Sequence, residues 1–426
     1  MKLSIGKVEK ENMNKKATIV LGVLVGILLL ATIVGPNMLL NSARQEEVAD
    51  SYAYSEVFFN EYEDVREHFL DTVKKFEEKD LEFQLYSYPI DEAEGLYIDS
   101  LYLPSKAEQT NLIVLTTGVH GIEGYIGSVM LDVFWQEVYP DLDREDTGVL
   151  VLANVNPYGM KYHRRYNENN VDLNRNFILE WNTFDMSVNK EYPKVDTFLG
   201  PQKTMKNAFW HEVQFYASLA KAAITQGADS ITNALLNGQY EYPQGVYYGG
   251  EKDEKSTAYV KSVFEQTLQS DYDNVIHIDV HSGYGPRYNM VIFNSVYETM
   301  NEEETKKLFD YDNVISYDSE SFYVTTGDTT DFYYRLREQM GVDTSLFSTC
   351  FEFGTIGDSF IDSIISLKYT VEENQNHWYP TKNGTMQQII HERYQELFYP
   401  TEKEWREKTV ADFTQACKGV LNAKLK

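Results

Sequence analysis

Apolar residues occur along this chain in short continuous runs that alternate with longer stretches at helical spacing. The continuous runs, which are typical of buried strands, lie at 111–115, 148–154, 274–280 and 345–353. Apolar positions three or four residues apart predict helices at 125–138, 210–226, 256–268 and 331–340, and a helical region from 386 to 424. Two extended segments are expected at 81–88 and 95–103. Strands that alternate with helices indicate an α/β fold, with a mixed, largely parallel sheet flanked by helices.

The amino-terminal pattern differs from the rest. Residues 17–35 carry no charge, and five lysines precede them within 1–16. Such a run is long enough to cross a bilayer as a helix, and lysines on its amino-terminal side favour a cytoplasmic amino terminus. We therefore expect a single-pass anchor at 17–38 in the cell membrane, with the catalytic domain extracytoplasmic. A cleaved signal peptide is the alternative, although the apolar run is long for one and 41–43 is a poor cleavage site.

This pattern divides the chain into four parts. A cytoplasmic basic segment (1–16) and the anchor (17–38) come first. A juxtamembrane helical segment with the first strands follows (44–109), and one catalytic domain with carboxyl-terminal helices occupies 110–426.

Composition excludes two classes of function. The formal net charge of −28 repels nucleic acid, so no nucleic-acid partner is expected. Only two cysteines are present, Cys350 and Cys417, which excludes a disulfide scaffold and a thiolate zinc site. Cys350 has no candidate base near it in sequence and is expected to be structural.

Candidate metal ligands stand where the predicted strands end. His120 and Glu123 follow the first strand, three residues apart, which is a workable spacing for a pair of zinc ligands. His281 ends the third strand and is a good third ligand. Strand alternation places His277 and Asp279 on the same face as His281. His277 lies deeper and is expected to be a hydrogen-bonded core histidine.

Two further groups of charged residues lie at the same predicted edge. Glu352 is near the end of the fourth strand, where a carboxylate is costly to bury unless it is paired or does chemistry. Three arginines, Arg164, Arg165 and Arg175, follow the second strand in an otherwise acidic protein. They can bind a substrate carboxylate or a developing oxyanion, or they can pair with local acids.

Six short motifs then appear in a fixed order across residues 110–356. They are His120-Gly-Ile-Glu123, Asn156-Pro-Tyr-Gly159, Asp172-Leu-Asn-Arg-Asn176, Tyr248-Gly-Gly250, Val280-His-Ser282 and Phe351-Glu-Phe353. This ordered set resembles the M14-type zinc carboxypeptidase superfamily. The resemblance is closest to a bacterial branch described as a domain of unknown function, related to succinylglutamate desuccinylase and aspartoacylase.

The resemblance implies a role for each matching residue. His120, Glu123 and His281 would bind Zn²⁺ and leave one position open for water. Glu352 would be the general base, and Arg165 would polarise the scissile carbonyl. Asn174 and Arg175 would bind a substrate carboxylate, and Tyr323 would close over the substrate. Asp172 would accept a hydrogen bond from His120 and orient its ring.

The chain also departs from the family pattern. The usual Asn-Pro-Asp-Gly has Tyr158 in its third position. Arg164 and Arg165 compete for one role, and Arg165 is preferred because an aromatic residue follows it. Tyr317, Tyr333 and Tyr334 are alternatives to Tyr323.

The expected function is that of a membrane-anchored zinc metallopeptidase that hydrolyses C-terminal peptide bonds. A zinc-dependent deacylase of N-acyl amino acids would use the same ligands and is the first alternative. A catalytically inactive ectodomain that binds peptides or wall fragments is the second. Retention of Glu352 together with all three ligands argues against it, and no Gly-x-Ser-x-Gly motif supports a serine hydrolase.

Overall fold

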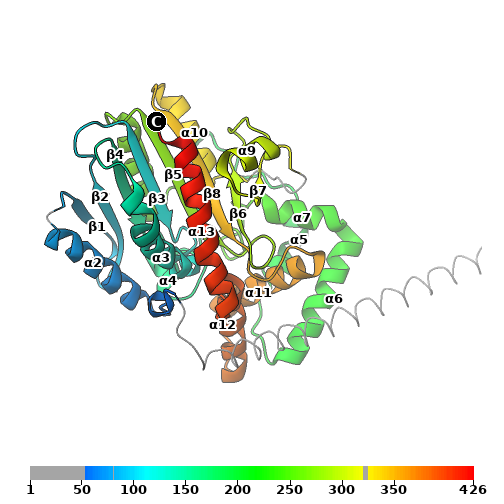
Figure 1. Ribbon diagram of the computed structural model, residues 1–426. Helices are drawn as coiled ribbons and strands as arrows, with labels where there is room; N and C mark the ends of the chain where they lie inside the picture. The colour runs from blue at the N-terminus through cyan, green and yellow to red at the C-terminus, as the bar shows by residue number, and fades with distance from the viewer. Residues whose placement is uncertain (1–52, 80, 320–324) are drawn as a thin grey trace, which may run out of the picture.

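The computed structural model describes residues 53–79, 81–319 and 325–426 (Figure 1). The predicted basic segment (1–16), the predicted anchor (17–38) and Tyr323 lie outside these ranges. Across the described ranges, every helix is either too short or too polar to cross a membrane.

One eight-stranded sheet forms the centre of the molecule, with the strand order β1-β2-β4-β3-β5-β8-β6-β7. The strands are β1 (Gln84–Asp91), β2 (Leu96–Leu103), β3 (Asn111–Thr117), β4 (Thr147–Ala153), β5 (Asn274–Ser282), β6 (Met290–Asn294), β7 (Val314–Ile315) and β8 (Ser345–Phe353). The four predicted buried strands are the four at its centre, and they pair in parallel. Strands β1, β2 and β6 join through antiparallel pairings. The predicted α/β sheet is therefore confirmed.

Helices cover both faces of the sheet. They are α2 (Tyr62–Glu78), α3 (Gly124–Val133), α4 (Pro157–Lys161), α5 (Tyr192–Leu199), α6 (Ala208–Gln226), α7 (Ala228–Leu236), α8 (Lys255–Gln269), α9 (Glu302–Phe309), α10 (Thr329–Met340), α11 (Phe360–Trp378), α12 (Gly384–Phe398) and α13 (Lys403–Lys424). The predicted helix at 125–138 ends as an α-helix at Val133 and continues as a π-helical turn. The region 386–424 is two helices, separated at Pro400 because proline cannot continue a helix.

Alternate side chains along the central strands point to opposite faces of the sheet and pack in two separate hydrophobic cores. Ile113 and Leu115 of β3 pack on the side covered by α2, α3 and α13. Leu112 and Val114 of the same strand pack on the side covered by α8 and α10. Burial on both faces explains why these strands read as continuous apolar runs.

A third group of helices, α5–α7 and α11, packs beside the sheet (Figure 1). Between α6, α11 and α12 lies a buried ionic network. Nζ of Lys368 is 2.7 Å from Glu212, and Arg393 pairs with Glu212 at 2.9 Å and with Glu372 at 3.2 Å. Buried ion pairs of this kind favour one relative arrangement of the helices, and they contribute little to the net free energy of unfolding. They hold α11, which supplies Ser366 and Thr370 to the cavity described below.

Strand register places the candidate site residues at one edge of the sheet. The carboxyl ends of β3, β5 and β8 lie side by side, with Thr117 opposite Val280 and His281 opposite Glu352. Ligands of α/β sheets bind at this edge.

Candidate active site

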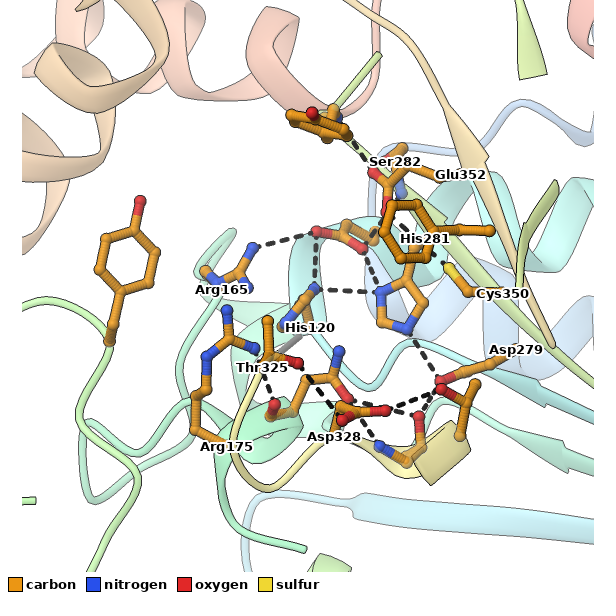
Figure 2. A pocket seen from close by; sticks show the side chains of 18 of the residues that line it. His120, Arg165, Arg175, Asp279, His281, Ser282, Thr325, Asp328, Cys350 and Glu352 are labelled. Atoms are coloured by element: carbon orange, nitrogen blue, oxygen red, sulfur yellow. Dashed lines mark hydrogen bonds and ion pairs between the residues drawn. The ribbon is translucent and has the colours of Figure 1, made fainter. Parts of the chain in front are cut away.

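His120, Glu123 and His281 converge at the carboxyl edge of the sheet, and all three are buried (Figure 2). Nδ1 of His120 is 2.8 Å from Oε1 of Glu123, and Nδ1 of His281 is 2.9 Å from Oε2. The two Nδ1 atoms are 3.1 Å apart. The three ligand atoms all lie within 4.8 Å of one another, and this is the one such group in the part of the chain that the structure describes.

Backbone packing determines the conformation of the loop that carries His120 and Glu123. Gly118 has a φ of +70°, which lets β3 turn sharply into the ligand loop. A Cβ on Gly121 would lie 2.2 Å from the backbone of Gly159, so the two motifs pack backbone against backbone. The amide N–H of Ile122 also donates to the carbonyl of Arg164 at 2.8 Å. Gly121 and Gly159 of the two motifs therefore have a direct steric role.

Both imidazoles have their outer nitrogen against a carboxylate. Nε2 of His281 lies 2.8 Å from Oδ2 of Asp279, and Nε2 of His120 lies 3.2 Å from Oδ1 of Asp172. A carboxylate only accepts, so each favours a proton on Nε2 and leaves the Nδ1 lone pair inward. Two lone pairs 3.1 Å apart repel unless a proton or a cation lies between them. Two imidazoles, one carboxylate and oriented outer nitrogens fit a catalytic zinc site.

The ionisation of these groups agrees with that fit. Burial opposes ionisation of Glu123, but the two imidazoles lower the pKa of Glu123 to about 2. Burial also opposes a charge on His281, but the carboxylates of Asp279 and Glu123 raise the pKa of this imidazole well above its usual range. Glu123 is therefore ionised, as a carboxylate ligand of a cation must be.

Glu352 lies next to His281 in the sheet and lines the same cavity. Its Oε1 accepts the backbone N–H of Tyr284 at 3.0 Å. Burial and the charge of Glu123 raise the pKa of Glu352 to about 7. A carboxyl group with such a pKa can both take up and release a proton near neutral pH, as a general acid–base group must.

The structure separates the two adjacent arginines. Arg165 lines the cavity, with Nε 2.8 Å from Asp172 and Nη1 3.6 Å from Glu123. Burial disfavours its charge, but these two acids raise the pKa of Arg165 and keep it charged. Arg164 turns away and pairs with Glu373 at 2.7 Å. Arg164 and Glu373 line a second cavity, together with Tyr158, His163, His377 and His391.

Arg175 and Asn174 line the other side of the metal cavity, which has a volume of 230 Å³. Asp172 positions both residues, because its side chain accepts the N–H of Asn174 at 3.1 Å and begins a short 3₁₀ turn. Arg175 donates from Nη1 to the carbonyl of Asn174 at 2.8 Å. Its Nε is buried without a hydrogen-bond partner within the described ranges. The arrangement leaves guanidinium donors available to an anion in the cavity.

None of the three alternatives to Tyr323 lines the cavity. Tyr323 lies outside the described residues. Tyr333 and Tyr334 are buried, and Tyr334 donates to Glu298 at 2.6 Å. The cavity is lined by Tyr247 and Tyr284. Tyr247 directly precedes the Tyr248-Gly-Gly250 motif and Tyr284 follows Val280-His-Ser282 by two residues, but neither was identified from the sequence.

Three more cavity residues, Thr325, Asp328 and Thr329, were not identified from the sequence. Strand alternation placed Asp279 on the face of His281, two residues before it, but its contact with that imidazole was not predicted. His277 is a core residue, as predicted. Its Nε2 lies 3.0 Å from Thr116 and its Nδ1 lies 2.8 Å from Ser348.

Comparison with known proteins places the chain in a family. A family model described as "Protein of unknown function (DUF2817)" matches residues 58–412. No curated protein matches the chain.

The chain is also similar to solved structures of metallocarboxypeptidases and of a desuccinylase. Carboxypeptidase A from Helicoverpa armigera is 13% identical over 84% of this chain and 79% of its own, with a TM-score of 0.42. Bovine thrombin-activatable fibrinolysis inhibitor, solved with tick carboxypeptidase inhibitor, is 16% identical over 76% and 99%, with a TM-score of 0.40. Succinylglutamate desuccinylase from Chromobacterium violaceum is 13% identical over 66% and 68%, with a TM-score of 0.32.

Proposed function

This chain belongs to the family described as protein of unknown function (DUF2817), and we propose that it is a zinc-dependent hydrolase that removes C-terminal residues from peptides. One observation carries the proposal. The ligand atoms of His120, Glu123 and His281 lie within 4.8 Å of one another, in a cavity that is also lined by the half-buried carboxyl group of Glu352.

Zinc held by His120, Glu123 and His281 would supply a Lewis acid that activates water and polarises the scissile carbonyl. Glu352 takes the proton from the attacking water and passes it to the nitrogen of the leaving amine. Oε1 accepts the backbone N–H of Tyr284 at 3.0 Å, whereas among the described residues Oε2 has only the weak thiol donor of Cys350 at 3.9 Å, so Oε2 is the oxygen proposed to exchange the proton. The pKa of about 7 suits both halves of this transfer.

Arg165 stabilises the negative charge that develops on the carbonyl oxygen. Its guanidinium is already held by Asp172 and lies close to Glu123, so it needs little reorganisation during the reaction.

The substrate ends in a free carboxylate, which Arg175 and Asn174 bind. Arg175 has a buried Nε without a partner, and a guanidinium pairs with a carboxylate through two parallel hydrogen bonds. Such a contact contributes roughly 1.5–3 kcal/mol, so losing it reduces kcat/KM by about 10- to 150-fold.

The test uses matched substrates with free C-termini, with amidated C-termini, and as N-acyl amino acids, with products identified by mass spectrometry. We expect free peptides to be cleaved and amidated ones to be poor substrates. Arg175→Ala should erase most of that preference, and Arg175→Lys should retain part of it, because lysine keeps the charge but not the paired geometry.

Each of the other outcomes indicates a different function for this protein. Equal cleavage of free and amidated peptides contradicts a carboxypeptidase. Release of the acyl group from N-acyl amino acids alone identifies the deacylase. Tight binding of peptides without cleavage identifies a binding domain.

We further propose that residues 17–38 anchor this domain to the cell membrane and that residues 44–426 face outward. The uncharged run at 17–35 and the lysines before it support this orientation.

A further inference from the structure

Thr329 lies between the two halves of the site. It is the first residue of α10, its side chain is buried, and it lines the cavity that contains the candidate ligands. We infer that Thr329 is a positioning residue that holds the metal ligand His281, through Asp279, and at the same time orients the Asn174 amide. The role toward His281, which we call the metal half, does not depend on the proposed substrate. The role toward Asn174, the substrate half, rests on the proposed function.

The hydroxyl of Thr329 donates to Oδ2 of Asp279. The same oxygen accepts Nε2–H of His281 at 2.8 Å. The other oxygen of Asp279 accepts the hydroxyl of Thr116 at 2.5 Å. Three donors on two oxygens allow this carboxylate one orientation, and Thr329 supplies one of them.

The proton positions in this network follow from chemistry. Asp279 only accepts while it is ionised, so the single hydroxyl proton of Thr116 points to it. The oxygen of Thr116 must then accept Nε2–H of His277, 3.0 Å away. Nδ1 of His277 is left to accept the hydroxyl of Ser348 at 2.8 Å. Each hydroxyl in this series of hydrogen bonds, from Ser348 through Thr116, therefore donates in the direction of Asp279.

The backbone of Thr329 acts on the other half of the site. Its N–H donates to Oδ1 of Asn174 at 3.0 Å. The flipped amide would place two N–H groups against this N–H, which is a donor against donors. Asn174 therefore keeps Oδ1 toward Thr329 and has its Nδ2 donors available to an anion in the cavity.

The one hydroxyl proton of Thr329 is directed to Asp279, so the 3.3 Å approach of Oγ1 to Oδ1 of Asn174 holds no proton. Three substitutions separate the two donors of Thr329, its hydroxyl and its N–H. Thr329→Val keeps the shape and the N–H but removes the hydroxyl. Thr329→Ser restores the hydroxyl. Thr329→Pro removes both donors at a position that tolerates proline, because the first residue of a helix needs no N–H partner and Asp328 before it is extended (φ −82°, ψ 159°).

The first measurement is the zinc dissociation constant of the full-length protein, by competition with a chelator. Removing a group that supports a ligand typically costs about 10- to 100-fold in metal affinity or activity. We expect Thr329→Val to raise the dissociation constant and lower kcat by factors in that range, with KM near the wild-type value. Thr329→Ser should recover most of both.

The second measurement is KM for a peptide with a free C-terminus. Thr329→Pro should match Thr329→Val in zinc affinity and in addition raise KM for the free peptide, with little change for the amidated one. Thr305→Val is the matched control. Thr305 is equally buried, donates to the carbonyl of Asn301 at 2.8 Å and does not line the cavity. It should leave zinc affinity and kcat unchanged.

Wild-type zinc affinity in Thr329→Val, or the same loss in Thr305→Val, would overturn the role of Thr329 in the metal half. An unchanged KM in Thr329→Pro would overturn its role in the substrate half. A wild-type protein that binds zinc but cleaves no substrate would instead overturn the proposed function, and the zinc affinities would still decide the role of the Thr329 hydroxyl.

Discussion

Nε2 of His281 lies 2.8 Å from Oδ2 of Asp279, two residues earlier on the same face of β5. One strand therefore carries both a candidate ligand and the group that orients it. Burial opposes ionisation of Asp279, but the charge of His281 and its hydrogen bonds lower the pKa of Asp279 to about 2. The carboxylate is consequently a fixed acceptor and a poor general base, which leaves Glu352 as the acid–base candidate.

Loss of either candidate imidazole ligand should abolish stoichiometric zinc binding. We expect His120→Ala and His281→Ala to lose zinc and activity while the protein remains folded, because zinc requires all three ligands at a catalytic site. Metal content by mass spectrometry and circular dichroism check this. His391→Ala, in an exposed histidine of the second cavity, should keep its zinc. Unchanged zinc content in both ligand variants would remove the assignment.

Glu352→Gln should separate catalysis from metal binding. Glutamine keeps the size of the side chain but cannot take a proton from water, so kcat should fall by at least ~10²-fold with zinc retained. Glu373→Gln alters a carboxylate outside the metal cavity and should turn over normally. Near-normal turnover in Glu352→Gln would contradict the proposed role.

The two adjacent arginines should give opposite results. Arg165→Ala removes a donor to the oxyanion and should lower kcat by roughly 10²- to 10³-fold. Arg164→Ala leaves the largely buried carboxylate of Glu373 without its partner, which should lower the free energy of unfolding by roughly 3–5 kcal/mol. Steady-state kinetics and urea unfolding on both variants distinguish these effects. A larger loss of kcat in Arg164→Ala, with unchanged stability, would reverse the assignment.

Asp331 should make stability depend on pH. Burial and the charge of Asp328 raise the pKa of Asp331 from 3.8 to about 7. Between these values the unfolded chain releases a proton that the folded protein keeps, so this residue lowers stability as pH rises through that window. Asp331→Asn should be more stable than wild type at pH 8, on the order of 2 kcal/mol, and equal to it near pH 4.

Urea unfolding of both proteins across this pH range gives the comparison. The difference between variant and wild type cancels the other titrating groups. A constant difference at all pH values would show that the pKa of Asp331 is the same in the folded and the unfolded chain.

Protease added to intact cells should degrade the proposed outward-facing domain. The expectation follows from the lysines before the uncharged run at 17–35. Immunoblotting for the domain, with a cytoplasmic protein as the control for lysis, provides the measurement. Protection of the domain until the cells are lysed would show that the orientation is wrong.

The sequence by itself determined the central sheet and the residues at its edge. β3, β4 and β5 are buried on both faces, so their apolar runs are continuous and easily recognised. His120, Glu123, His281 and Glu352 stand where such runs end. Because parallel strands end at one edge, their convergence could be expected without knowledge of the strand order. The carboxyl-terminal helices were predicted across 386–424, but the position of the break at Pro400 was not.

Only the tertiary structure decided what the neighbouring side chains do. Arg164 and Arg165 are adjacent in an irregular segment, where no period predicts direction, and long-range partners turn one to Glu373 and the other to Asp172. Thr329 is 50 residues from Asp279 and 155 from Asn174, yet it contacts both. Local pattern reports which residues are buried in a strand or helix. Hydrogen bonds between distant loops depend on how the whole chain packs.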